Sequence, residues 1–356
     1  MSQDAVARAI EQHRALLWGL CYRMSGCAAD ADDLVQDVAE RALLKPPADT
    51  TVELRPWLVR VAMNLSRDHL RRRRRRSYRG TWLPGPASVE HGVLAQRVTA
   101  ETRYGELESV TAAFLLALEA LTPAQRSVLL LRDVVGYSVA ETAELLDMST
   151  SNVKTTHHRA RASMAGYDGE PADLSEQRLR RHRSALRALL VHLSSRNVDA
   201  LTALLREDVR ALNDSDGKYF AARREVVGRA KVILFHLKVN AMHERTQAGT
   251  PRGTIEMLNG EPALVAHWPS GDPRIPARMV VRISIDDDGR IRQLDTVVAD
   301  RKLSHLRFDG LGGRWDGREL VESLHAALTH RPLWEWVPAA ALRVGRAARH
   351  AVRRRG

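Results

Sequence analysis

Residues 121–164 read LTPAQRSVLLLRDVVGYSVAETAELLDMSTSNVKTTHHRARASM, and this stretch decides how the middle of the chain folds. The segment TPAQ, residues 122–125, is a helix start with a capping threonine, a proline at the first helical position and a glutamine at the third. The segment SVAE, residues 138–141, opens a second helix in the same way. Asp147 follows at a tight turn, where aspartate tolerates left-handed backbone better than most residues. The sequence therefore predicts a helix-turn-helix.

The helix after Ser149 has two different faces. Its inner stripe carries Val153, His157, Ala160 and Met164. Its outer face is polar and basic, which suits a helix that enters the major groove of DNA. On this outer face we expect base contacts from Ser151, Asn152, Thr155 and Arg159, and phosphate contacts from Lys154, His158 and Arg161.

The composition points to a polyanionic partner. The 356 residues carry a formal net charge of +12, and residues 71–76 are an unbroken run of arginine, so nucleic acid is the partner that we expect. Cys21 and Cys27 lie six residues apart, which fits no metal motif, and we expect reduced thiols, no metal and no cofactor. No stretch is apolar enough to span a membrane and no cleavable leader is evident, so we expect a cytoplasmic protein.

The pattern along the chain predicts a multidomain fold. Two helices are expected near residues 175–195 and 197–206, followed by a turn at 213–217. Two hairpins are then expected, one around Asn259-Gly260 and one around residues 286–289, which suggests an α+β domain with a curved antiparallel sheet. The expected segments are an all-helical module at 1–76, a glycine- and proline-rich flexible linker at 77–106, a helix-turn-helix module at 107–166, the α+β domain at 174–305, and an unassigned basic tail at 306–356.

Two blocks of sequence carry a family resemblance. The first contains YRMSG at residues 22–26, DADDLVQD at 30–37 and NLSRDHLR at 64–71; the second runs from Leu121 to Arg161. In this order, joined by a linker, they resemble bacterial RNA polymerase sigma factors of the extracytoplasmic-function group. The resemblance implies a promoter-melting module followed by a module that binds the upstream promoter element. Core RNA polymerase and promoter DNA would be the partners.

The resemblance also implies roles for the first module. The acidic helix 30–37 would dock on the largest subunit of the polymerase, a contact that complementary charge favours. Its expected polymerase-binding residues are Asp32, Asp33, Gln36 and Asp37. The next helix would contact DNA at the edge of the melted region, through Arg55, Arg60, Asn64, Arg67 and Arg71. The loop 45–54 corresponds to the family segment that holds an extruded promoter base.

The remainder resembles the sigma subgroup with a C-terminal SnoaL-like domain, a cone-shaped α+β fold. The resemblance rests on DSDGK at residues 214–218, NGEPALV at 259–265, RKLSHL at 301–306 and the linker segment YRGTWLPGP at 78–86. In that subgroup the extra domain is thought to control the sigma modules in cis. The regulatory residues that this implies are Asp214, Asp216, Gly217 and Lys218.

Other readings of the chain stay open at this point. SnoaL-like folds can hold catalytic acids and bases, for which the candidates are Asp214, Asp216, Lys218, His267 and Asp295. Aspartates in hairpin turns more often serve the turn itself, so we expect no enzyme, although the domain could bind a small-molecule ligand. A helix-turn-helix regulator or ligand sensor that works without polymerase is the alternative. The acidic helix argues against it, because such a regulator does not need that surface.

Overall fold

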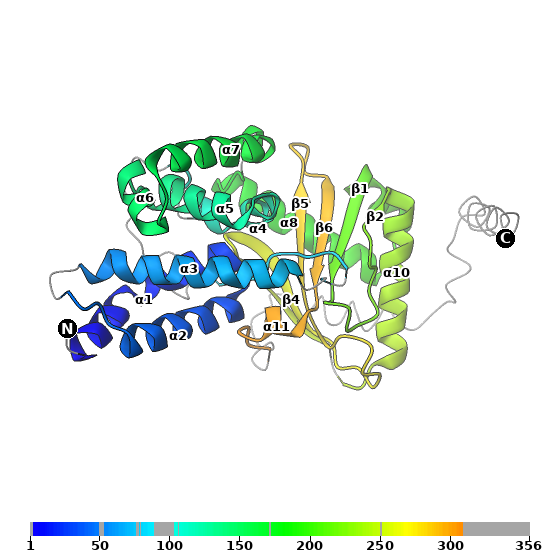
Figure 1. Ribbon diagram of the computed structural model, residues 1–356. Coiled ribbons are helices and arrows are strands. Elements are labelled where there is room, and N and C mark those ends of the chain that lie inside the picture. Colours follow the sequence, from blue (N-terminus) through cyan, green and yellow to red (C-terminus); the bar gives the residue numbers. More distant parts are fainter. Residues whose placement is uncertain are drawn as a thin grey trace, which may run out of the picture.

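The computed structural model contains two groups of helices followed by a six-stranded sheet that is covered by helices (Figure 1). The helices of the N-terminal half lie on one side of the sheet, and α10 covers the other side (Figure 1). This architecture confirms the expected multidomain fold, helical at first and α+β after it. The structure describes residues 3–49, 53–75, 78, 80–88, 103–105, 107–170, 172–249 and 251–308.

Three helices form the first module: α1 (Gln3–Ser25), α2 (Ala28–Leu44) and α3 (Leu54–Arg75). Each buries an apolar stripe, as amphipathic helices do, and the three pack against one another. The helix α3 begins at Leu54, two residues before Pro56. Cys21 and Cys27 are both buried and free.

The second module begins with short helical segments and ends with the expected helix-turn-helix. Both capping boxes are formed, and Asp147 adopts the left-handed backbone with φ 54°. The long final helix is capped by Ser149, whose hydroxyl accepts a bond from the Asn152 N–H. The segments are η1 (Glu108–Val110), α4 (Ala112–Ala117), η2 (Leu118–Ala120), α5 (Pro123–Leu129), the π-helical η3 (Leu130–Val135), α6 (Val139–Leu146) and α7 (Thr150–Gly169).

The two helical modules share one hydrophobic core. Leu20 and Met24 of α1 belong to the same buried cluster as Phe114, Leu118 and Leu129 of the second module, and all five are at most 1% exposed. Separating the modules would return this apolar surface to water, at about 25 cal/mol for each Å² exposed. The modules are therefore held together as one body.

The C-terminal domain confirms both hairpins and departs from the expected sheet in one respect. Its strands are ordered β2-β1-β6-β5-β4-β3, and β1 and β6 run parallel while the other neighbours are antiparallel. The expectation of a wholly antiparallel sheet is thus wrong for this pair. The elements are α8 (Glu176–Ser194), α9 (Val198–Leu204), β1 (Leu205–Asp214), β2 (Val226–Val227), α10 (Arg229–Thr246), β3 (Arg252–Leu258), β4 (Glu261–His267), β5 (Arg278–Ile285), β6 (Ile291–Val297) and α11 (Asp300–Leu303).

Both faces of this sheet carry buried apolar residues. Residues such as Leu294 pack with α8 and α10, whereas Val297, three residues on, packs on the opposite face with Leu83. Leu83 is fully buried, and residues 83–87, part of the segment expected from its composition to be flexible, are instead buried between the modules. Of the unassigned tail, residues 309–356 fall outside the described residues.

We expect the C-terminal domain to lose stability in acid because of His243 on α10. This ring is 2% exposed, and burial lowers its pKa to about 4. The unfolded chain takes up a proton near pH 6.5, whereas the folded domain resists it until about pH 4. The stabilising contribution is therefore complete above about pH 6.5 and is lost as the pH falls. Over about 2.5 pH units the loss approaches about 3 kcal/mol.

Urea unfolding at pH 7, 6, 5 and 4 checks this prediction. His243→Gln should flatten the decline between pH 6.5 and 4. His182→Gln should do the same independently, because burial also lowers the pKa of His182 to about 4. An unchanged decline in both variants would contradict the prediction.

Candidate nucleic-acid interface

The outer face of α7 presents the residues expected to contact DNA. Ser151, Asn152 and Lys154 are exposed in its first turns, and Thr155, His158, Arg159 and Arg161 are exposed further along. The inner stripe is buried except for His157, which is half-buried at the edge of the core. The helix therefore has the amphipathic form that groove binding requires.

A buried carboxylate beneath this helix fixes two of its side chains. The Oδ2 atom of Asp133 lies 2.9 Å from Nε2 of His157, and the guanidinium of Arg161 donates to both carboxylate oxygens at 3.0 and 3.1 Å. Burial acts to raise the pKa of Asp133, but His157 and Arg161 outweigh it and hold that pKa below its ordinary value. Arg161, expected to meet phosphate, is thus engaged within the protein.

The acidic face of α2 is exposed at each residue expected to bind polymerase: Asp32, Asp33, Gln36 and Asp37. Two contacts organise this face. The indole N–H of Trp18 donates to Asp32 at 2.6 Å, and Arg301 of the C-terminal domain reaches Asp33 at 2.5 Å. The face is therefore in part already occupied.

The basic residues of α3 are only partly available. Arg60, Asn64 and Arg71 are exposed, and Arg67 is half-buried. A cleft of about 280 Å³ between α2 and α3 is lined by Arg41, Trp57, Arg60, Val61, Asn64, Leu65 and Asp68. Arg55 is also exposed, and its guanidinium lies 5.9 Å from the centre of the Tyr137 ring of the second module.

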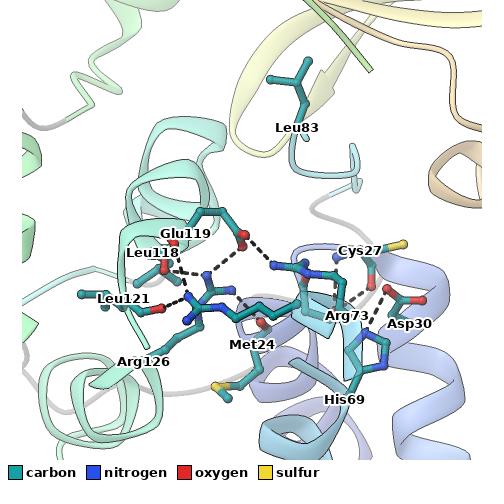
Figure 2. Close-up of polar contacts among 12 residues, drawn as sticks. Met24, Cys27, Asp30, His69, Arg73, Leu83, Leu118, Glu119, Leu121 and Arg126 are labelled. Carbon is teal, nitrogen blue, oxygen red and sulfur yellow. Dashed lines mark hydrogen bonds and ion pairs between the residues drawn. The ribbon is translucent and has the colours of Figure 1, made fainter. Parts of the chain in front are cut away.

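The middle of the arginine run contacts the second module. Figure 2 shows Glu119 between two guanidinium groups, with Arg73 at 2.5 Å and Arg126 at 2.7 Å. Arg126 is 1% exposed and also donates to the carbonyl of Met24 in α1, at 2.7 Å. Burial acts to raise the pKa of Glu119, but the two arginines hold it below its ordinary value. Arg74 completes the contact through the carbonyl of Leu121.

Asn259 joins all parts of the chain at one buried point. It is 1% exposed, occupies the β3–β4 turn with φ 56°, and donates its amide to the Tyr22 hydroxyl at 2.6 Å and the Val110 carbonyl at 2.8 Å. Its amide oxygen accepts from the N–H of Ala87 at 3.2 Å. One side chain of the C-terminal domain thus contacts the first module, the linker and the second module.

A buried ion pair holds the linker on the C-terminal domain. Asp214 is fully buried and lies 2.6 Å from Nζ of Lys302. The backbone N–H of Leu83 donates to the same carboxylate at 2.7 Å, and Lys302 donates to the Leu83 carbonyl at 2.5 Å. The hydroxyl of Tyr78 donates to the other carboxylate oxygen. The linker is therefore bonded to both partners of the ion pair, Asp214 and Lys302.

The other expected regulatory residues have different surroundings. Gly217 lies in the turn with φ 71°, Asp216 is exposed, and exposed Lys218 forms an ion pair with Asp300. The sequence gives no sign that Asn259 bonds to other modules, because the Asn-Gly pair is fully explained as a hairpin turn. Lys302 lies within the RKLSHL stretch, and no local pattern indicates that its partner is Asp214.

The candidate catalytic residues are not gathered into one site. Asp295 lies opposite Arg282 in the sheet, whereas His267 pairs with Arg278, four residues away along β5. At about 3.4 Å per residue this offset separates Asp295 from His267 by more than 10 Å. Asp214 is bonded to Lys302 and the linker.

Among the described residues no helix is long and apolar enough to cross a membrane.

Comparison with known proteins identifies the two helical modules and the architecture. The family model for Sigma-70 region 2 matches residues 9–76, and that for Sigma-70 region 4 matches residues 111–164. The chain is 31% identical over 283 residues to the ECF RNA polymerase sigma factor SigJ of Mycobacterium tuberculosis, across 78% of this chain and 86% of that protein. The probable ECF RNA polymerase sigma factor SigI of the same species is 33% identical over 322 residues, across 88% of this chain and 100% of that protein.

The similarity extends to the C-terminal domain. The crystal structure of SigJ superimposes with a TM-score of 0.60 at 25% identity, and covers 84% of this chain and 98% of that structure. Three findings support the same family: the architecture of helices followed by a sheet, the two Sigma-70 regions in order, and relatives that match most of the chain. The chain belongs to the extracytoplasmic-function group of RNA polymerase sigma factors.

Proposed function

We propose that this sigma factor is kept in a closed, inactive arrangement by its own C-terminal domain. As a sigma factor it binds core RNA polymerase and directs promoter-specific initiation. The observation that carries the proposal is the side chain of Asn259, which bonds to region 2, the linker and region 4 at one buried point. A domain that binds region 2, the linker and region 4 at once opposes any rearrangement among these three parts.

The closed arrangement conflicts with DNA binding. Arg73 and Arg74 follow the exposed arginines of α3, and both are bound to region 4 in place of a DNA backbone. Arg55 likewise faces Tyr137. Phosphate contacts supply much of the affinity for DNA, so Arg73 and Arg74 must leave Glu119 and Leu121 of region 4 before they can contribute.

In the open form we assign the DNA contacts to two surfaces. Region 2 would use Arg55, Arg60, Asn64, Arg67 and Arg71, with the cleft beside Trp57 as the place for an unpaired base. Region 4 would use Ser151, Asn152, Lys154, Thr155, His158 and Arg159, whereas Arg161 stays bound to Asp133 within region 4. Core polymerase would bind the acidic face of α2. None of these roles requires chemistry by the chain itself.

Promoter-dependent transcription with purified core polymerase tests the proposal. We expect weak initiation by the full chain and strong initiation by residues 1–170. Initiation by the Asn259→Gly variant should lie between these two levels, because glycine keeps the left-handed turn while the three bonds of the amide are lost. At about 1 kcal/mol net per bond, a gain of about tenfold or more is expected.

A thermal melt of Asn259→Gly shows whether the variant remains folded. Equal initiation by the full chain and by residues 1–170 would contradict control by the C-terminal domain. Initiation only by the full chain would reverse the sign of that control.

A further inference from the structure

One residue of the C-terminal domain binds the surface of α2 that is assigned to polymerase. Arg301 in α11 donates through Nε to Oδ1 of Asp30 at 2.7 Å and through Nη2 to Oδ2 of Asp33 at 2.5 Å. The two carboxylates are three residues apart on α2, so they lie on the same face of that helix. The planar guanidinium fork spans both of them, which the point charge of a lysine would not do.

The position of Arg301 is fixed by its neighbour. Lys302, the next residue of α11, is buried in the ion pair with Asp214 and the linker. Arg301 remains 57% exposed and extends to region 2 instead. Because its backbone is anchored by Lys302, less conformational freedom is lost when its side chain forms the two contacts. Asp30 is itself held in place, with one oxygen 3.4 Å from Nε2 of His69.

A groove on the same side of region 2 also involves the C-terminal domain. Its volume is about 710 Å³, and the polymerase candidates Asp32 and Gln36 line it together with Trp18. His305, four residues after Arg301, lines the same groove. The C-terminal domain thus contacts the acidic surface of α2 through Arg301 and helps to line the groove beside it.

We infer that Arg301 competes directly with core polymerase for α2, by occupying the place of a cation of the polymerase. This inference rests on the proposed function and names the contact through which closure excludes the partner. A partner attracted to an acidic helix face presents basic groups, and an arginine already bound to Asp30 and Asp33 satisfies the same carboxylates. Asp32, Gln36 and Asp37 stay exposed, so polymerase must displace Arg301 to use the whole face.

The affinity of the full chain for core polymerase tests this inference, measured by anisotropy of a labelled chain. Arg301→Ala removes the competing cation, and affinity should rise about twofold to fivefold, the range of an exposed ion pair. Arg301→Glu places a third carboxylate beside Asp30 and Asp33, and affinity should rise about tenfold. Arg187→Glu, which reverses the charge of an exposed arginine on α8, is the matched control and should leave affinity within twofold.

Asp33→Ala gives a second, independent readout. In the native background this change removes both the internal ion pair and the polymerase contact, so the two effects partly cancel. In the Arg301→Ala background only the polymerase contact is lost, and the fall in affinity should be larger. Equal falls in the two backgrounds would show that Arg301 and polymerase do not share Asp33.

The outcomes separate this inference from the proposed function. If Asn259→Gly raises core affinity while Arg301→Glu leaves it unchanged, closure is real but Arg301 does not compete, and the inference is overturned. If neither variant changes core affinity and residues 1–170 initiate no better than the full chain, the proposed function fails as well. A rise with Arg301→Glu but not with Arg187→Glu supports the competition.

Discussion

Asp214→Asn is expected to lower the free energy of unfolding by about 3–5 kcal/mol, because it leaves the buried ammonium of Lys302 without a counter-charge. Asp214 is fully buried and Lys302 is 5% exposed, so water cannot take the place of the lost carboxylate. Burial already lowers the pKa of Lys302, and Asp214 opposes that shift. Without Asp214 the lysine would lose its proton more readily, and the destabilisation should shrink as the pH rises.

Hydrogen exchange at Leu83 reports this change locally, because its N–H donates to the Asp214 carboxylate. We expect faster exchange for residues 80–88 in the variant, together with the fall in stability from urea unfolding. The double variant Asp214→Asn with Lys302→Met removes both charges and should recover most of the stability, since only an unpaired charge carries the large cost. A double variant less stable than the single one would contradict this account.

Glu119→Gln is expected to destabilise the contact between regions 2 and 4 by a similar amount, about 3–5 kcal/mol. The change leaves two guanidinium groups, Arg73 and Arg126, without their shared carboxylate. Arg126 is 1% exposed and cannot turn to solvent. Because the pKa of Glu119 is held low by these arginines, the native contact should itself weaken in acid as the pH falls through that lowered pKa.

Small-angle scattering and urea unfolding check the second prediction. The variant should be less stable, and its radius of gyration should grow if region 4 leaves α3. The control is Glu144→Gln, which neutralises an exposed glutamate of α6 in the same region. Its free energy of unfolding should stay within about 0.5 kcal/mol of that of the native chain. Equal stability of the two variants would mean that the buried network contributes nothing.

Local signals made the second module predictable. Its capping boxes and the left-handed Asp147 depend on neighbouring residues, so the sequence alone indicates them. The hairpin around Asn259 was predictable for the same reason, although its role in joining the modules was not. A turn residue that satisfies local geometry gives no sign that its side chain also bonds to distant segments.

The elements and contacts that the sequence did not indicate depend on packing and pairing between residues far apart in the chain. The strand β1 carries charged residues along much of its length and was recognisable only by its parallel pairing with β6. The helix α10 was missed although it is 18 residues long, since its apolar residues spread around it without forming a clear stripe. The ion pair of Arg301 with Asp33 joins residues 268 positions apart, and no local pattern reports such a contact.

The covalent connection between region 4 and the C-terminal domain has a further consequence. The helix α7 ends at Gly169 and α8 begins at Glu176, so residues 170–175 alone join the two parts. Over so short a tether the effective concentration of one part around the other is on the order of millimolar, whatever the amount of protein in the cell. Contacts too weak to inhibit in trans are therefore sufficient here. The ratio of inhibitor to target is always one to one, and changes in expression cannot alter it.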